Sequence, residues 1–340
     1  MKKLLPTLRL SLDMTNVLAK IEHAGIKVNL ETLNDIRNEY EHELTTIDKR
    51  LKQIVSDVMG DTPINLNSAD DRSMLFYSRK INNKETWTRI FNIGHEMRGA
   101  TRKIKMRKKM SKELFARTIR NNTEVIKKTT GYQCGTCEGV GRVRFKLKNG
   151  QLGKANRLCK NCNATGVVYS QSKQVAGLRI VPRNTKDVAQ AGFKTDKTTL
   201  EEMLPALSGA AKEFVELYVR YSALRTYLST FVEGMENNVD ENNFIHPEFM
   251  QCITATGRLS SRNPNFQNMP RGSTFRIRKV VESRFEGGSI IEGDYSQLEF
   301  RVAGFLANDS QIYKDVKDGV DVHAYTASVI GCDRQTAKAD

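Results

Sequence analysis

The chain has 340 residues, of which 39% are hydrophobic, and its net charge is +15. This length is enough for two or three domains with hydrophobic cores, and no apolar run approaches the roughly 20 residues of a membrane-spanning helix. The N-terminal stretch MKKLLPTLRLSLD begins like a signal peptide, but Pro6 and Arg9 interrupt it and no small-residue cleavage site follows. We therefore expect a cytoplasmic protein that does not enter a membrane.

The first eighty residues are predicted to be mainly helical. Residues 12–24 form an amphipathic pattern that Gly25 ends, and IKVN reads as a short extended piece. Residues 30–58 carry one apolar stripe at helical spacing, which predicts a long helix. A loop then leads to Asn67 or Ser68, either of which can cap a helix through Met74 and Phe76.

Residues 82–182 hold most of the positive charge. They contain 23 lysines and arginines, five glutamates and no aspartate, a net charge of +18 that leaves the rest of the chain slightly acidic. Twelve of the cations lie between residues 98 and 128, against only Glu113 and Glu124. Such a cluster repels itself unless an anion is near, so it predicts a nucleic-acid-binding module. A solvated basic surface without a partner is the alternative.

Two Cys-x-x-Cys pairs lie inside this basic segment, and 21 residues separate them. Four thiolates at this kind of spacing can hold one Zn²⁺ ion tetrahedrally and leave no open position, so we expect a structural zinc module at residues 134–166. Two disulfides are the alternative, which the lack of a secretion signal disfavours. The predicted ligands are Cys134, Cys137, Cys159 and Cys162.

Helical pattern resumes after the basic segment. TDKTTLEEML predicts a helix that Thr198 or Thr199 can cap, and a second long helix is expected over residues 210–235. From residue 237 to 272, Gly, Pro and Asn become frequent, which indicates loops and short strands.

The stretch SIIEGDYSQLEFRVAGFLAND begins as a short apolar run that predicts a buried strand ending at Asp294. A helix is expected after it, with apolar residues at Leu298, Val302, Phe305 and Leu306. An aspartate at the end of a buried strand is costly unless something pairs with it, so we expect Asp294 to have a partner. The alternative is that Asp294 caps this helix in a box with Gln297.

Three motifs in this order, TATGRLSSRNPNFQNMP, DYSQLEFRVAGFL and DVHAYTA, resemble those of the family A DNA polymerases. The resemblance covers most of residues 10–81 and 190–340 and leaves 82–182 as an insertion. It implies an α/β multidomain (α+β) fold: the thumb and a partial palm of a right-hand polymerase, ending before the fingers are complete. The implied domains are palm entry and thumb helices at 1–81, the basic insertion with its zinc module at 82–182, the thumb helix returning to the palm at 183–237, and the first palm part with the start of the fingers at 238–340.

The resemblance also implies roles for single residues. Asp294 and the Tyr295 carbonyl would hold one of two catalytic Mg²⁺ ions, whose second carboxylate lies outside this chain. Glu299, the other catalytic candidate, would fill the space that a ribose 2′-hydroxyl needs; an exposed helix charge is its alternative. The implied nucleotide-binding residues are Tyr295, Gln297, His323, Arg334 and Lys338, and the implied DNA-binding residues are Arg258, Asn265, Gln267 and Asn268. A solvated Arg334/Lys338 pair and loop-capping amides are the alternatives for these positions.

The function that this resemblance implies is DNA-directed DNA polymerase, a nucleotidyltransferase of DNA replication. Its partners would be primer–template DNA, deoxynucleoside triphosphates, and a processivity factor or a separate C-terminal polymerase fragment. The family's later motifs are missing, so we expect the chain to be inactive alone, and its compact start and unusual insertion are phage-like. The alternative is a non-catalytic, zinc-containing DNA-binding fragment or processivity module.

Overall fold

The computed structural model describes residues 5–98, 101–104, 106, 108–146, 152–270, 275–334 and 337. It divides into two compact units, Met1–Val281 and Glu282–Asp340, each of which is described by itself. No described helix is both long and apolar enough to cross a membrane.

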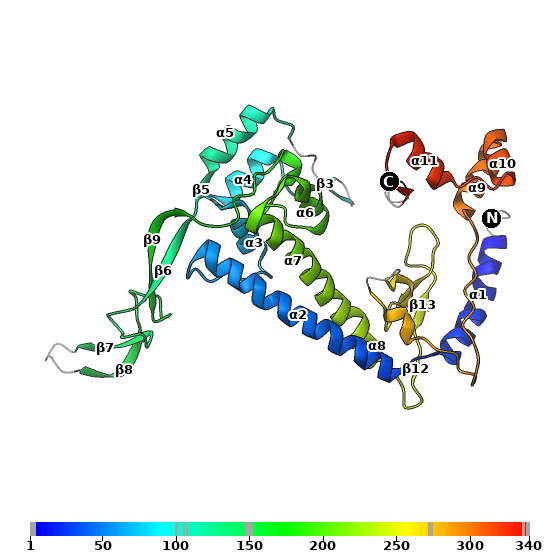
Figure 1. Cartoon of the computed structure of the whole chain (residues 1–340), viewed down its shortest axis with the longest axis horizontal. Helices are drawn as coiled ribbons and strands as arrows, with labels where there is room; N and C mark the ends of the chain where they lie inside the picture. Colours follow the sequence, from blue (N-terminus) through cyan, green and yellow to red (C-terminus); the bar gives the residue numbers. More distant parts are fainter. Residues whose placement is uncertain are drawn as a thin grey trace. The chain divides into compact units, whose positions relative to one another are not determined.

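Two long helices of the first unit run side by side (Figure 1). Helix α2 (Leu30–Met59) begins at Asn29, whose side chain accepts the Thr32 N–H at 2.8 Å, and ends at Gly60 with φ of 73°. Helix α7 (Gly209–Tyr227) continues through a π-helical turn (Leu228–Val232) into α8 (Glu233–Glu236). The Arg220 guanidinium of α7 contacts the Glu43 carboxylate of α2 at 2.7 Å. Both predicted long helices are confirmed, and the predicted stripe of α2 is buried or half-buried.

Further helices of the first unit lie before and between the two long ones in the sequence. Helix α1 (Leu5–Ala24) ends before Gly25 as predicted but begins earlier, and Ser68 caps α3 (Ala69–Tyr77). Asp196, not Thr198 or Thr199, caps α6 (Lys197–Met203), because its carboxylate accepts both the N–H and the hydroxyl of Thr199. The 3₁₀ helices are Thr185–Asp187, Leu204–Ala206, Phe266–Asn268 and Ile277–Val280.

Part of the basic segment also belongs to this core. Helices α4 (Lys84–Phe91) and α5 (Lys112–Asn122), which the sequence interpretation missed, bury apolar side chains at i and i+4 spacing. These side chains are Trp87, Phe91, Phe115 and Ile119. The indole N–H of Trp87 donates to the Ala189 carbonyl at 2.9 Å, so the basic segment and the residues after it share one hydrophobic core.

The described strands of the first unit pair two by two and antiparallel. The small sheets are β1 (Ile26–Lys27) with β12 (Phe244–Ile245), β2 (Arg79–Ile81) with β5 (Thr123–Val125), β3 (His95–Arg98) with β4 (Thr101–Ile104), β10 (Val188–Ala189) with β11 (Gly192–Phe193), and β13 (Glu248–Met250) with β14 (Ser260–Arg262).

A longer two-stranded arm joins β6 (Lys127–Gln133) to β9 (Val167–Val175) (Figure 1). Its base is fixed beside the end of α2, because the Asp61 N–H donates to the Thr129 carbonyl at 3.0 Å and the Gly131 N–H donates to the Asp61 carboxylate at 2.7 Å. The cysteines follow at its far end, with a second hairpin of β7 (Arg142–Lys146) and β8 (Leu152–Leu158) beyond them.

The second unit contains α9 (Leu298–Ala307), α10 (Ser310–Lys317) and α11 (Val322–Ile330). The predicted helix over α9 is confirmed, but the predicted buried strand before Asp294 is wrong. Ile290 and Ile291 are 61% and 93% exposed, because no described strand pairs with this stretch or covers it. The capping alternative for Asp294 is also wrong, since α9 begins after Gln297, which has φ of 52° and no side-chain cap.

Candidate metal centre and polymerase motifs

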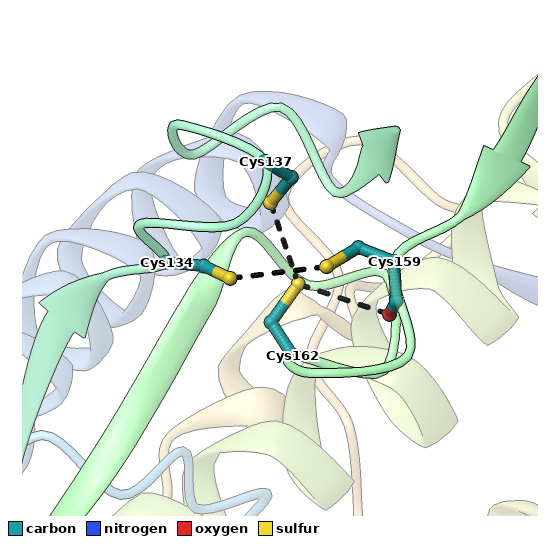
Figure 2. A group of neighbouring side chains, drawn as sticks. All are labelled: Cys134, Cys137, Cys159 and Cys162. Carbon is teal, nitrogen blue, oxygen red and sulfur yellow. Dashed lines mark hydrogen bonds between the residues drawn. The ribbon is translucent and has the colours of Figure 1, made fainter. Parts of the chain in front are cut away.

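The four predicted cysteine ligands converge at the end of the arm (Figure 2). All four Sγ atoms lie within 4.8 Å of one another, with 3.8 Å between Cys134 and Cys159 and 3.6 Å between Cys137 and Cys162. A tetrahedral Zn²⁺ site with Zn–S bonds of about 2.3 Å requires sulfur pairs about 3.8 Å apart. The cysteines are free thiols, so the alternative of two disulfides is wrong for this structure. All four are buried, and the cluster fits a single four-thiolate metal ion.

Matching turns shape the two halves of this centre. The Gly141 N–H donates to Cys137 Sγ and the Gly166 N–H donates to Cys162 Sγ, each at 3.2 Å. Both glycines have positive φ, and a Cβ atom would lie 2.2 Å from the Ala164 carbonyl oxygen at Gly141 and 2.1 Å from a carbonyl oxygen at Gly166. Only glycine therefore allows the two turns to approach this closely.

The surroundings of the sulfurs shift the pKa values of two of the cysteines in opposite directions. Burial raises the pKa of Cys137. Burial also acts to raise the pKa of Cys134, but hydrogen bonds from backbone N–H groups and from the Asn161 amide outweigh it and lower that pKa. Asn161 donates to Cys134 Sγ at 3.6 Å and to the Thr136 hydroxyl at 3.1 Å. The sequence interpretation missed Asn161, because the Cys-x-x-Cys pattern specifies no residue type between its two cysteines.

The predicted DNA-contacting residues lie around the β13–β14 hairpin of the first unit. Arg258 is exposed and follows Gly257, whose N–H closes a turn on the Thr254 carbonyl at 3.2 Å. Asn265 caps the 3₁₀ helix Phe266–Asn268, since its side chain accepts the Asn268 N–H at 3.2 Å. The loop-capping alternative thus describes what Asn265 does in this structure. Gln267 and Asn268 have exposed side chains.

The predicted metal and nucleotide residues lie in the second unit. Asp294, Tyr295 and Glu299 are exposed, and Glu299 stands in the first turn of α9. Among the described residues Asp294 forms no ion pair or side-chain hydrogen bond. Gln297 precedes α9 and is half-buried, as is His323 in α11.

Of the predicted pair of phosphate-binding cations, Arg334 is described and Lys338 lies outside the described residues. The Arg334 guanidinium contacts the Asp321 carboxylate at 2.8 Å, and this hydrogen bond lowers the pKa of Asp321. Arg334 is therefore paired with a carboxylate of its own unit in this structure.

Comparison with known proteins places these residues in one family. The sequence profile of DNA polymerase family A matches residues 166–339, about half of the chain. The chain belongs to DNA polymerase family A. All polymerase-type site residues, from Arg258 to Lys338, lie within the match, whereas the four cysteines lie before it. The match begins inside the segment that we interpreted as an insertion.

Several bacterial DNA polymerases are similar in sequence to part of this chain. DNA polymerase I of Treponema pallidum (strain Nichols) is 36% identical over 141 residues, which cover 41% of this chain and 14% of that protein. The thermostable DNA polymerase I of Thermus filiformis is 37% identical over 142 residues, which cover 40% of this chain and 17% of that protein. The matched part thus spans less than a fifth of the length of these relatives.

The fold comparison extends over nearly the whole chain. The POL domain of Pol1 from M. smegmatis, solved in complex with DNA primer-template and dNTP, matches 97% of this chain and 41% of its own chain. The TM-score is 0.52 and the sequence identity is 18%, so the likeness concerns the fold. The mixed helix and strand architecture of this family A chain is that of part of a polymerase domain.

Proposed function

We propose that this chain is the front part of a DNA-directed DNA polymerase domain, which adds deoxynucleotides to a primer 3′ end on a template. The observation that supports this proposal is the family A match, because it contains every predicted catalytic and nucleotide-binding residue. The similar bacterial proteins are DNA polymerases, and the solved neighbour holds primer-template and dNTP. We assign the activity to the cytoplasm.

The proposed domains follow the family resemblance. Residues 1–81 and 183–237, which contain the paired helices α2 and α7, would form the palm entry and the thumb. Residues 238–340 would form the first part of the palm and the start of the fingers. Residues 82–182 would be the insertion, although α4 and α5 pack into the core of the first unit. The part that stands apart from this core is the arm from β6 to β9.

Asp294 is the proposed ligand of a catalytic Mg²⁺ ion, together with the Tyr295 carbonyl. Its exposed carboxylate forms no ion pair in the described part of the chain, which suits a hard cation that takes oxygen ligands. Two bound Mg²⁺ ions would supply charge stabilisation for phosphoryl transfer, and the second carboxylate would come from outside this chain. Glu299, five residues further along, would exclude the 2′-hydroxyl of a ribonucleotide.

The remaining site residues would position the two substrates. His323, Arg334 and Lys338 would contact the triphosphate, and Arg334 would exchange Asp321 for it, because a guanidinium binds phosphate and carboxylate oxygens in the same way. Gln297 would lie beside the incoming nucleotide. Amide side chains donate and accept at groove edges without demanding one sequence, which suits the primer–template contacts. These contacts would be made by Arg258, Asn265, Gln267 and Asn268.

A non-catalytic DNA-binding fragment is the second candidate. The observation that favours it is the second unit, where Gly304, Ala327 and Ala337 are the only buried residues among those described. Large apolar side chains of this unit, such as Phe305 (70% exposed), are typical of a surface that another polypeptide covers. Primer extension by the chain, with and without a polypeptide that supplies the rest of a family A polymerase domain, separates the candidates. We expect extension only from the mixture, and the DNA-binding fragment predicts none from either.

For the cysteine centre we propose one structural Zn²⁺ ion that folds residues 134–166. This module would present exposed cations to the phosphates of product DNA, and the described ones include Arg142, Arg144 and Lys160. Docking of a processivity factor is the competing use of the arm.

Removing the far part of the arm is expected to weaken the salt dependence of DNA binding. Tyr132 and Val168 are cross-strand partners, so an Asn-Gly turn can join them in place of residues 133–167. The replaced segment has seven cations and one glutamate. Each lost phosphate contact removes about 0.9 from the slope of log K against log salt, so we expect the slope to flatten by about 2 or more.

Fluorescence anisotropy over a salt series measures this slope, and an unchanged thermal midpoint of the shortened chain is the control for folding. In the assembled polymerase, single-nucleotide insertion at saturating DNA is expected to stay within about twofold, since such a tether binds ground and transition states equally. If the slope of log K against log salt did not change, the arm would not bind DNA, and docking of a protein partner would be its function instead.

A further inference from the structure

A second feature of the basic segment lies beside α5, away from the arm's far end. A cavity of about 520 Å³ opens between α5, the start of β2, β5 and residues 179–183. Its floor is apolar, with Phe115, Ile119 and Ile180 each at least 94% buried, while Val181 at its edge is 78% exposed. We call this cavity the α5 groove.

The rim of the α5 groove is strongly basic. Five cations line it, Arg79, Lys112, Arg120, Arg179 and Arg183, and no carboxylate of the described residues does. The Arg183 guanidinium is neutralised by the Asp187 and Glu202 carboxylates, both at 2.8 Å. The other four form no ion pair within the described chain.

Two of these four cations have neutral partners. The Arg79 guanidinium donates to the Thr123 hydroxyl at 3.1 Å, and that of Arg179 donates to the Val175 carbonyl at 3.2 Å. Lys112 and Arg120 stand at the two ends of α5 and are exposed. The groove therefore combines an apolar floor with four cations that form no ion pair among the described residues, and charge complementarity calls for an anionic partner.

We propose that the α5 groove binds an acidic peptide segment of a partner protein, with a bulky apolar side chain of that segment on the floor. This goes beyond the polymerase activity and does not depend on it. A peptide uses both features, because carboxylates meet the rim while an apolar side chain fills the cavity. A single-stranded nucleic acid fits less well, because its bases stack on exposed aromatic rings and the lining aromatics Tyr77 and Phe115 are 2% and 5% exposed.

The test uses a fluorescein-labelled 12-residue peptide in which Asp and Glu alternate with Leu and Phe, titrated with the full chain. We expect Lys112→Glu/Arg120→Glu to weaken binding by about tenfold or more, since two attractive charge contacts become repulsive. The variant should fold, because its two glutamates have opposite effects on the stability of α5. The one near the N-terminus of the helix stabilises it and the one near the C-terminus destabilises it, by similar small free energies. Val181→Ser removes exposed apolar surface alone and should weaken binding about threefold.

The matched control is Arg142→Glu/Arg144→Glu, which makes the same change of charge on two exposed arginines of the arm. It should leave peptide binding within about twofold, since these arginines lie outside the groove. Peptides with Lys for the acids, or Ser for the apolar residues, should bind at least about tenfold more weakly. Equal binding by the α5 variant and the control, or by either altered peptide, would overturn the proposal. The affinity for a single-stranded oligonucleotide is the last comparison. If Lys112→Glu/Arg120→Glu lowered it as much as it lowers the affinity for the peptide, the proposal would also be overturned.

Discussion

Asp294→Asn is expected to reduce primer extension at least tenfold in a polymerase that combines this chain with the rest of the domain. An amide lacks the charge that holds Mg²⁺, and loss of a metal ligand removes several kcal/mol of transition-state stabilisation. Extension of a labelled primer, followed by gel electrophoresis under single-turnover conditions, measures the loss.

The Asp294 variant should keep its fold and its affinity for DNA. The side chain is exposed and forms no ion pair among the described residues, so its replacement costs little stability. Asp318→Asn changes the same charge at another exposed position of the second unit and should leave extension unchanged. If the Asp294 variant retained more than about a tenth of the activity, the carboxylate would not be a metal ligand.

Cys134→Ser/Cys159→Ser is expected to abolish the binding of one zinc ion per chain. Structural zinc sites supply about 10–16 kcal/mol in small zinc modules, so residues 134–166 should lose their fold with the metal. Elemental analysis of dialysed protein gives the zinc content, and hydrogen exchange gives the protection of backbone amides in the module. Because thiolates bind the ion and thiols do not, zinc should also dissociate as the pH falls.

The other two cysteines of the chain provide the matched control for zinc binding. Cys252 is exposed and Cys332 half-buried, and both lie outside the cluster. Cys252→Ser/Cys332→Ser should keep the full zinc content and the protected module. Zinc that stayed bound to the Cys134/Cys159 variant would contradict the four-thiolate site.

The helical spacing of apolar residues correctly predicted the long helices that bury one face. The stripe of α2 was readable because its residues repeat at helical spacing over a long stretch. Helices α4 and α5 were missed although Trp87 and Phe91, like Phe115 and Ile119, follow the same spacing. Each pair is short and surrounded by cations, so the charge of the segment dominated its interpretation.

The stretch before Asp294 shows the opposite error. Its run of Ile290 and Ile291 resembles a buried strand, but apolar character alone supplies neither a hydrogen-bonding neighbour nor a covering layer. The cysteine centre was predictable because the ligands are explicit in the sequence. Its contact with Asn161 was not, since that contact depends on how the two turns face each other.

Templated addition of one nucleotide tests the central claim most directly. The chain, mixed with a polypeptide that supplies the rest of the polymerase domain, is given a labelled primer–template, Mg²⁺ and each nucleotide in turn. We predict addition of the deoxynucleotide complementary to the template, much slower addition of the three others and of the matching ribonucleotide, and no addition without Mg²⁺. Addition that ignored the template base, or that preferred the ribonucleotide, would contradict the assignment of this chain to a DNA-directed DNA polymerase activity.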